Sequence, residues 1–361
     1  MKSLGRFPDN FGAELGAQPD AILAAAAGLR DQAGGLTHVG RAAEGARTVV
    51  FTGMGGSYDV CHAPVTLLAE AGIPAVMVDA AELLHFRRPI LRGDSILVAA
   101  SQSGESAELV RLVEMEDWPA GRPTIVSVTN GIGSSLARAA SVALDSRAGI
   151  EAGPSTKTFA ASLVVLAGVA RVLSGDAPSE AVGTVAAEAT VAAGALQSLL
   201  DRRDELGSSA SDWVGDRPVL AVLGRGTARA CAEMAALLMK EAARFPAESL
   251  EAGQFRHGPL ELAGPDLAVA VVATEPATHD LDLGLAADLE RAGASVMVVG
   301  STSEATALHP PAMYVGIGEV PRSLAPAVSM VPFQLLAWNM ATARGRDPLR
   351  LEVASKVTTH E

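Results

Sequence analysis

The sequence predicts an α/β protein of two tandem domains, each a doubly wound parallel sheet in an αβα sandwich. The chain has 361 residues, which corresponds to two domains at the usual size of about 150 residues each. Short β-branched runs alternate with Ala- and Leu-rich stretches of helical length, the pattern of layered α/β folds. The strand-like runs are apolar throughout, which favours strands buried on both faces of a parallel sheet.

An internal repeat supports the division into two domains. Three apolar runs recur in the same order at offsets of about 171 to 173 residues, which indicates a duplicated domain. The pairs are Thr48–Gly56 with Pro218–Gly226, Ser95–Ser101 with Leu267–Thr274, and Thr124–Thr129 with Ser295–Gly300.

The remaining elements follow in chain order. N-terminal helices are expected within residues 10–45, and residues 155–205 are expected to form a long helical connector. Between them we expect helices near Ala63–Ala71, Ala80–Phe86 and Glu105–Glu116, with a strand at Ala75–Val78; a last helix is expected at Pro332–Arg344. The predicted domains are an N-terminal helical segment at 1–45, a first sheet domain at 46–205, a second at 206–344 and an irregular tail at 345–361.

Composition excludes several classes of function. With 28 Lys and Arg against 41 Asp and Glu, the net charge of −13 argues against binding nucleic acid or an anionic membrane through the whole surface. The N-terminus lacks the apolar stretch of a secretory signal, and two cysteines, Cys61 and Cys231, fit a reducing cytoplasm. The histidines show no metal-ligand spacing, so neither a metal nor another cofactor is expected.

A serine-rich loop follows the strand at Ile96–Ala100. Ser101-Gln-Ser-Gly-Glu-Ser106 offers three hydroxyls and backbone N–H groups where a helix begins, which suits a phosphate monoester. The simpler interpretation is a Ser N-cap beside a tight Gly turn. The turn at Gly53–Ser57 also joins a strand to a helix and could approach the same ligand. The second repeat has Thr274–His279 at this place, which lacks the glycine and gains an acid, so only the first repeat should bind phosphate.

The motifs together resemble the sugar isomerase (SIS) domain family, in particular the isomerase half of glucosamine-6-phosphate synthase and stand-alone aminosugar-phosphate deaminases. The matching pieces occur in family order and cover essentially the whole chain. They are FTGMGGSY (51–58), ASQSGES (100–106), SVTNGIGSSLA (127–137), EAGPSTKTF (151–159), LGRGTARACAEMAALLMKEA (223–242), ESLEAGQFRHGPLEL (248–262) and ASKVTTHE (354–361).

The resemblance implies a role for each matching residue. Phosphate-binding residues are Ser57, Ser101, Gln102, Ser103 and Ser106, and further substrate contacts are Gly55, Glu151 and Ser155. Glu241 would move the proton between C1 and C2, His257 would open the sugar ring from the partner subunit of a homodimer, and Lys356 in the tail that closes the active site would capture the carbonyl. The chemistry agrees, because these steps need a carboxylate, a group titrating near neutral pH and an amine. Without the resemblance, the simpler interpretation of Glu241 is a solvated charge at a helix end, next to Lys240.

The sequence also departs from the family pattern. The synthase's glutamine-hydrolysing domain, with its N-terminal cysteine, is absent; Leu238 stands where the family helix often has a lysine; and Glu352 stands where a basic residue is expected, with Arg350 nearby. The segment at Glu151 is one residue shorter than usual.

Three functions remain open. The first is deamination with isomerisation of glucosamine 6-phosphate or a close relative. The alternative is a lyase that removes the C2 proton of N-acetylglucosamine 6-phosphate and eliminates at C3. The third is a non-catalytic sugar-phosphate sensor.

Overall fold

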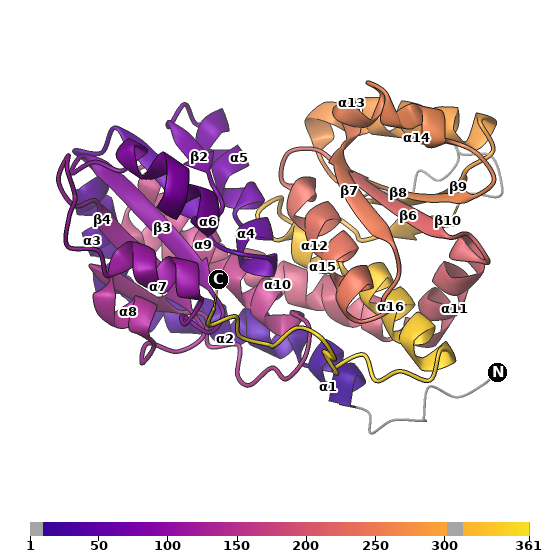
Figure 1. Cartoon of the computed structure of the whole chain (residues 1–361), viewed down its shortest axis with the longest axis horizontal. Coiled ribbons are helices and arrows are strands. Elements are labelled where there is room, and N and C mark those ends of the chain that lie inside the picture. Colours follow the sequence, from indigo (N-terminus) through magenta and orange to yellow (C-terminus); the bar gives the residue numbers. More distant parts are fainter. Residues whose placement is uncertain (1–9, 302–312, 361) are drawn as a thin grey trace. The chain divides into compact units, whose positions relative to one another are not determined.

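The computed structural model describes residues 10–301 and 313–360. Two five-stranded parallel sheets with helices on both sides (Figure 1) confirm the predicted fold class. The first sheet, in the order β2-β1-β3-β4-β5, consists of β1 (Thr48–Thr52), β2 (Ala75–Met77), β3 (Ser95–Ser101), β4 (Thr124–Thr129) and β5 (Val142–Asp145). The second, in the order β10-β9-β8-β6-β7, consists of β6 (Val219–Gly224), β7 (Ala247–Glu251), β8 (Leu267–Ala273), β9 (Ser295–Gly300) and β10 (Met313–Gly316).

The two sheets have the same connectivity. In each, the first strand lies between the second and the third, and the fourth and fifth strands extend the sheet beyond the third. Corresponding strands begin about 171 residues apart, as β1 at Thr48 and β6 at Val219 illustrate. The repeat seen in the sequence is therefore a repeat of the fold.

Helices flank both sheets. Those up to the end of the first repeat are α1 (Asn10–Gly16), α2 (Gln18–Asp31), α3 (Ala33–Ala43), α4 (Gly56–Asp59), α5 (His62–Glu70), α6 (Ala80–Glu82), α7 (Ala107–Val113), α8 (Ser135–Ala139) and α9 (Lys157–Leu173). Then follow α10 (Pro178–Leu200), α11 (Arg203–Val214), α12 (Ala228–Glu241), α13 (Ala252–Phe255), α14 (His279–Arg291), α15 (Ala325–Ser329) and α16 (Val331–Ala343). Short π or 3₁₀ turns cover Leu83–Arg87, Arg88–Ile90, Pro259–Leu262 and Pro276–Thr278.

The chain divides into two compact units, which we describe separately. The first-sheet unit comprises Asp20–Glu151, Lys157–Thr190 and the tail from Ala354 onward. The second-sheet unit comprises Ala152–Thr156, Val191–Val353 and the described residues up to Pro19.

Each sheet has its own hydrophobic core. In the first-sheet unit, alternate strand residues such as Val50, Leu97 and Ile125 pack against Leu109 and Leu112 of α7. In the second-sheet unit, the corresponding core joins residues of β6, β8 and β9 to α14 and contains Leu223, Val269, Val296, Leu285 and Leu289. Both cores fix the strand ends from which the loops leave.

The structure also differs from the sequence-based expectations. Strands β5, β7 and β10 were not anticipated, and all three lie at sheet edges, where residues are only partly buried and the run of apolar residues is broken. The helix expected at Glu105–Glu116 is confined to Ala107–Val113. The segment expected near Ala80–Phe86 is mostly a π turn, and the long connector is two helices separated at Gly175, which has φ +104°.

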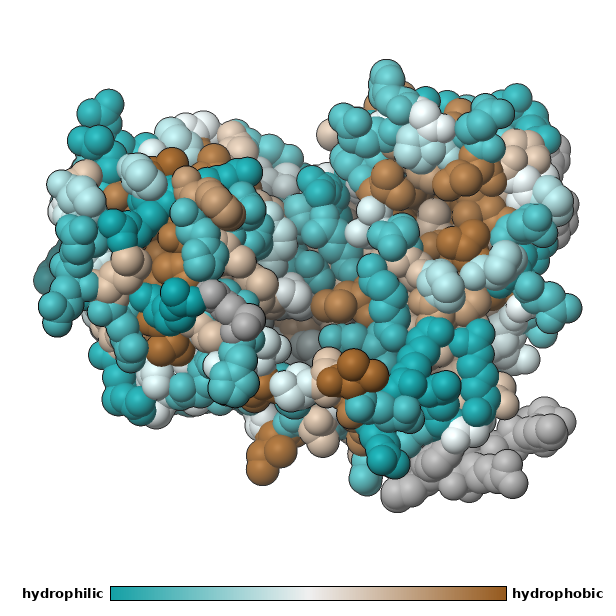
Figure 2. Space-filling view, viewed as in Figure 1, coloured by the Kyte–Doolittle hydropathy of each residue, from teal (hydrophilic) through white to brown (hydrophobic). Residues whose placement is uncertain are grey.

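The visible surface is mainly hydrophilic, and hydrophobic residues form small groups on it (Figure 2). Within the described residues, no helix combines the length and apolar character needed to cross a membrane.

Candidate functional site

The loops after β1 and β3 meet at the carboxyl edge of the first sheet. β1 and β3 are neighbours, and the sheet extends from them in opposite directions. Doubly wound folds usually bind ligands at such a switch point. The contact is direct, because the backbone N–H of Gln102 donates to Ser57 Oγ at 3.3 Å. The structure thus brings together the two loops that the sequence singled out.

The serine loop is a tight turn built around its own hydroxyls. Ser101 Oγ accepts from the N–H of Gly104 at 3.0 Å and lies 3.3 Å from Ser106 Oγ. Ser103 Oγ accepts from the N–H of Glu105 at 3.1 Å. Gly104 has φ +65°, and a Cβ there would collide with the side chain of Ser134, so only glycine fits the turn.

Ser106 does not act as a simple helix cap. It occupies the N-cap position of α7, but its side chain makes no capping hydrogen bond. In contrast, Ser134 caps α8 by accepting from the N–H of Ala137 at 3.3 Å. The N–H of Ala107 at the start of α7 donates instead to the Thr358 carbonyl of the tail at 3.1 Å. The Ser106 hydroxyl is therefore turned toward Ser101 rather than toward the helix.

The tail brings Lys356 to a fully buried carboxylate of the same unit. Lys356 Nζ donates to Glu151 Oε2 at 2.8 Å, and the Glu151 side chain is 0% exposed. Thr158 near the start of α9 holds the same carboxylate, with its hydroxyl 2.6 Å from Oε2 and its N–H 3.1 Å from Oε1. The Glu151 carboxylate thus accepts hydrogen bonds from both the tail and α9.

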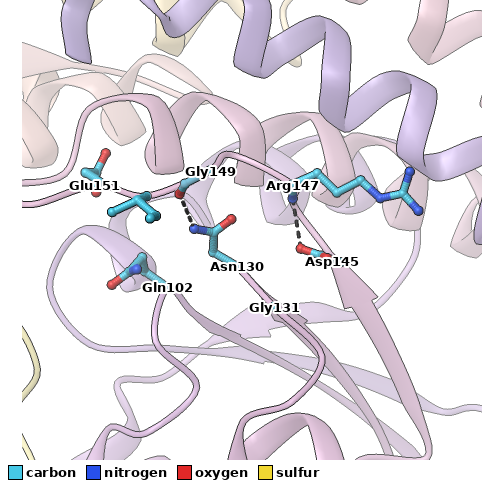
Figure 3. A pocket seen from close by; sticks show the side chains of 8 residues that line it. Gln102, Asn130, Gly131, Asp145, Arg147, Gly149 and Glu151 are labelled. Atoms are coloured by element: carbon cyan, nitrogen blue, oxygen red, sulfur yellow. Dashed lines mark hydrogen bonds between the residues drawn. The ribbon is translucent and has the colours of Figure 1, made fainter. Parts of the chain in front are cut away.

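A pocket of about 550 Å³ lies beside Glu151 (Figure 3). Its lining residues come from the ends of β3, β4 and β5 and the segments that follow them: Gln102, Asn130, Gly131, Asp145, Arg147, Gly149, Ile150 and Glu151. Asn130 Nδ2 donates to the Gly149 carbonyl at 2.7 Å, and its Oδ1 accepts from the N–H of Ala148 at 2.9 Å. The Arg147 side chain extends away from Gln102 and Glu151 and pairs with Asp31 at 2.7 Å.

The other candidate residues belong to the second-sheet unit. Glu241 is the last residue of α12 and is half-buried. His257 is exposed in the turn after α13, directly before Gly258, which has φ +124°. Ser155 is half-buried and lies in the short segment Ala152–Thr156, whereas Gly55 lies in the first-sheet unit with φ +54°.

The structure shows the surroundings of the three residues involved in the departures from the family pattern. Leu238 is fully buried on α12. Glu352 pairs with Arg244 at 2.8 Å and lies 3.7 Å from Arg346, so this tail acid is held by arginines in the second-sheet unit. Arg350, by contrast, is exposed, and its N–H donates to the Asp347 carbonyl at 3.1 Å.

Neither cysteine offers a nucleophile. Cys61 and Cys231 are buried, and burial raises the pKa of both thiols, with the charge of Asp59 adding to the effect at Cys61. Among residues 10–301 and 313–360, no group of three or more His, Cys, Asp or Glu side chains is arranged to hold a metal ion.

Sequence reasoning did not assign roles to Asn130, Asp145, Thr158 or Thr358. Asn130 directly follows a predicted strand, so the rule that identified the serine loop could have identified it as well. Thr158 and Thr358 carry no comparable signal, because their contacts join segments that are far apart in the sequence.

Comparisons with known proteins agree with this architecture. The SIS domain model matches residues 44–170 and 216–344, one match for each repeat. A glutamine–fructose-6-phosphate aminotransferase (isomerizing) from Aeropyrum pernix is 34% identical over 354 residues, which cover 95% of this chain and 54% of that protein. Its counterpart from Pyrococcus horikoshii is 31% identical over 319 residues, or 87% of this chain and 52% of that protein. The chain spans about half the length of these curated relatives.

Two solved structures share the fold. The C-terminal domain of glucosamine-fructose-6-phosphate aminotransferase from Francisella tularensis superimposes with a TM-score of 0.82 at 22% identity, covering 97% of this chain and 100% of that one. A glucosamine-6-phosphate deaminase from Thermotoga maritima gives a TM-score of 0.66 at 18% identity, covering 91% and 98%. With a match to each of its two sheet domains, this chain belongs to the SIS domain family.

Proposed function

We propose that the protein deaminates and isomerises an aminosugar 6-phosphate, with glucosamine 6-phosphate or a close relative as substrate. The observation that carries the proposal is the serine loop at the switch point of the first sheet. Relatives named as isomerizing aminotransferases and a deaminase of the same fold support it.

Phosphate binding follows from the hydroxyls of the loop. Ser57, Ser101 and Ser103 accept hydrogen bonds from backbone N–H groups of the loop, so hydroxyls and N–H groups are already gathered at one point. Phosphate oxygens would take over these N–H donors, and each hydroxyl would then donate to the phosphate. This arrangement needs no metal and no basic cluster, which fits a chain with a net charge of −13.

The proposed reaction moves one proton and releases one ammonia. After His257 of the partner subunit assists ring opening, Glu241 removes the C2 proton of the open-chain aldehyde and returns it to C1. The resulting C2 imine reacts with water to give the ketose phosphate and ammonia. No external oxidant or reductant is required, since the aldehyde carbon is reduced as C2 is oxidised.

A specific contact favours a second candidate, the lyase. Lys356 Nζ donates to the buried Glu151 carboxylate at 2.8 Å, and a lysine engaged in this way can stabilise a developing enolate without adding to the carbonyl. In this reaction Glu241 removes the C2 proton of N-acetylglucosamine 6-phosphate and the C3 oxygen leaves as water, which yields an unsaturated aldehyde.

One pair of incubations separates these possibilities. The protein is given glucosamine 6-phosphate or its N-acetyl form, and ammonia, fructose 6-phosphate and ultraviolet-absorbing enal are followed. Ammonia and ketose from the first substrate support the deaminase, and enal from the second supports the lyase. Binding of a sugar phosphate without formation of ammonia, ketose or enal would support the non-catalytic sensor. Unphosphorylated glucosamine is the control, and equal affinity for it would contradict the assignment of the serine loop.

Lys356 distinguishes the two enzymatic routes further. If Lys356 forms a Schiff base with the ketose, borohydride with fructose 6-phosphate adds the sugar mass to the tail peptide, and Lys356→Arg abolishes the adduct because guanidinium stays protonated. If Lys356 serves only as a cation, no adduct forms and Lys356→Arg keeps partial activity.

A further inference from the structure

The second sheet preserves the backbone of the switch point that the first sheet uses. Gly53 and Gly224 occupy corresponding positions in the two repeats. A Cβ on Gly53 would lie 2.5 Å from Ser57 O, and a Cβ on Gly224 would lie 2.8 Å from Ala228 O, so at both positions the backbone of the next helix leaves no room for a side chain. Two residues later Gly55 and Gly226 adopt almost the same conformation, with φ +54° and +52°. The loop that approaches the ligand has therefore been kept in both repeats.

In the second sheet this loop already surrounds an anionic group. The Glu275 carboxylate accepts from the Thr227 N–H at 2.7 Å and from the Thr227 hydroxyl at 2.5 Å. Its other oxygen lies 2.5 Å from Arg322 Nη2, and the side chain is only 4% exposed. A Cβ on Gly226 would lie 2.9 Å from the carboxyl carbon, so the carboxylate rests directly against the glycine turn.

The position of Glu275 corresponds to the serine loop. Glu275 lies two residues beyond the end of β8, as Ser103 lies two residues beyond the end of β3. Thr227 directly follows Gly226, immediately before the 14-residue helix α12. A hydroxyl, a backbone N–H and a guanidinium gathered around oxygen atoms are the donors that bind a phosphate as readily as a carboxylate.

We infer that the second sheet retains an anion site filled by Glu275, and that removing this carboxylate opens the site to a phosphate monoester. The inference rests on the proposed function only in taking the serine loop as a phosphate site. Glu275 thus acts as an internal substitute for phosphate, and each chain binds one sugar phosphate rather than two. If Glu275 were only a cap for α12, its removal would weaken the helix without creating a binding site.

The experiment counts bound ligands by equilibrium dialysis and calorimetry. Native protein is expected to bind one glucosamine 6-phosphate per chain. Glu275→Ser is expected to bind inorganic phosphate or glucosamine 6-phosphate at a second site, giving two per chain. The isosteric Glu275→Gln keeps the space filled and should stay at one, and Glu275→Ser combined with Arg322→Leu should return to one.

Thermal unfolding provides a second measurement of phosphate binding if Glu275→Ser is less stable than the native protein. Added inorganic phosphate should raise the melting temperature of Glu275→Ser, or of Glu275→Ala if the serine variant is unstable, by several degrees more than that of Glu275→Gln. A folded Glu275→Ser or Glu275→Ala that binds no second ligand and gains no phosphate stabilisation overturns the inference. Native protein that binds no glucosamine 6-phosphate contradicts the proposed function instead, and the two failures are thereby distinct.

Discussion

At the scale of single residues, the candidate phosphate site depends on hydroxyls whose geometry is set by one glycine. Ser101 and Ser103 accept from N–H groups within their own turn, and that turn exists because Gly104 adopts φ +65° beside Ser134. Each hydrogen bond to a charged phosphate is worth about 1.5–3 kcal/mol, so two serines would contribute about 3–6 kcal/mol, against the roughly 8 kcal/mol of a micromolar affinity. Small changes in the turn therefore have large effects on binding.

Gly104→Ala is expected to weaken phosphosugar binding at least about fivefold. The new Cβ would meet the Ser134 side chain and Thr129 Cγ2, and alanine disfavours positive φ, which together cost about 1–3 kcal/mol. Gly133→Ala is the matched control, because its Cβ would meet no atom within 4 Å. Calorimetric titration with glucosamine 6-phosphate measures both, and equal affinities would show that the turn does not set the site.

Glu105 is expected to make the stability of the folded protein depend on pH. The N–H of Ser135 donates to its carboxylate at 2.8 Å and holds the pKa of Glu105 below its usual range. Because the folded state favours the charged form, this stabilisation is complete above about pH 4.3, the ordinary pKa of glutamate, and is lost as the pH falls through the lowered value. Glu105 is only half-buried, so screening by solvent limits the effect to at most about 1 kcal/mol.

The measurement is the melting temperature of the native protein and of Glu105→Gln as the pH is lowered. The native protein should lose more stability than the variant below about pH 4.3. Parallel curves for the two proteins would mean that Ser135 does not hold the carboxylate in solution.

At the scale of elements, the C-terminal tail is fastened at two points four residues apart in the chain. Glu352 pairs with Arg244, three residues after Glu241, and Lys356 pairs with Glu151. The glutamate that departs from the family pattern thus has a partner of opposite charge just past the helix that ends at Glu241. We expect this pair to position the tail lysine.

Glu352→Arg should reduce kcat two- to fivefold and leave KM nearly unchanged. The pair is partly exposed and worth about 0.5–1 kcal/mol, and neither of its residues belongs to the serine loop. The double variant Glu352→Arg with Arg244→Glu restores an opposite-charge pair and should recover most of the lost kcat. Steady-state kinetics measure this, and a double variant as slow as the single one would show that the pair does not act through its charges.

The elements also show what the sequence alone could predict. Interior strands such as β3 and β8 are continuous apolar runs, and they were identifiable because both of their faces are buried. Edge strand β7 reads AESLE and has no such run, so its existence depends on pairing with β6. Ser101 and Gln102 were found by the strand-to-loop rule. The pairing of Glu151 with Lys356 spans 205 residues and no local pattern encodes it.

At the scale of the whole molecule, duplication has produced two similar sheets that carry different candidate residues. The first carries the serine loop, and the second carries Glu241, the exposed His257 and an anion site occupied by Glu275. The exposure of His257 on a turn is consistent with a side chain that serves a neighbouring subunit. The proposed homodimer with shared active sites follows from this role.

Hybrid sites test that assembly. Glu241→Gln and His257→Ala should each be inactive alone, because each removes one group from every site. After subunit exchange, the mixture should regain up to about a quarter of native activity, since half of the dimers are hybrids and each has one complete site. Mass-labelled subunits verify that exchange has occurred. If activity still does not recover, His257 belongs to its own chain's site or takes no part in catalysis.

The central claim is that Glu241 removes the C2 proton of an aminosugar phosphate held by the serine loop. Nuclear magnetic resonance in D₂O tests it most directly, by following the C2 hydrogen of glucosamine 6-phosphate and of its N-acetyl form. Both enzymatic routes predict loss of that hydrogen with native protein, and none with Glu241→Gln at unchanged ligand affinity. Retention of the C2 hydrogen of both sugars by native protein that binds them, or full exchange by Glu241→Gln, would contradict the claim.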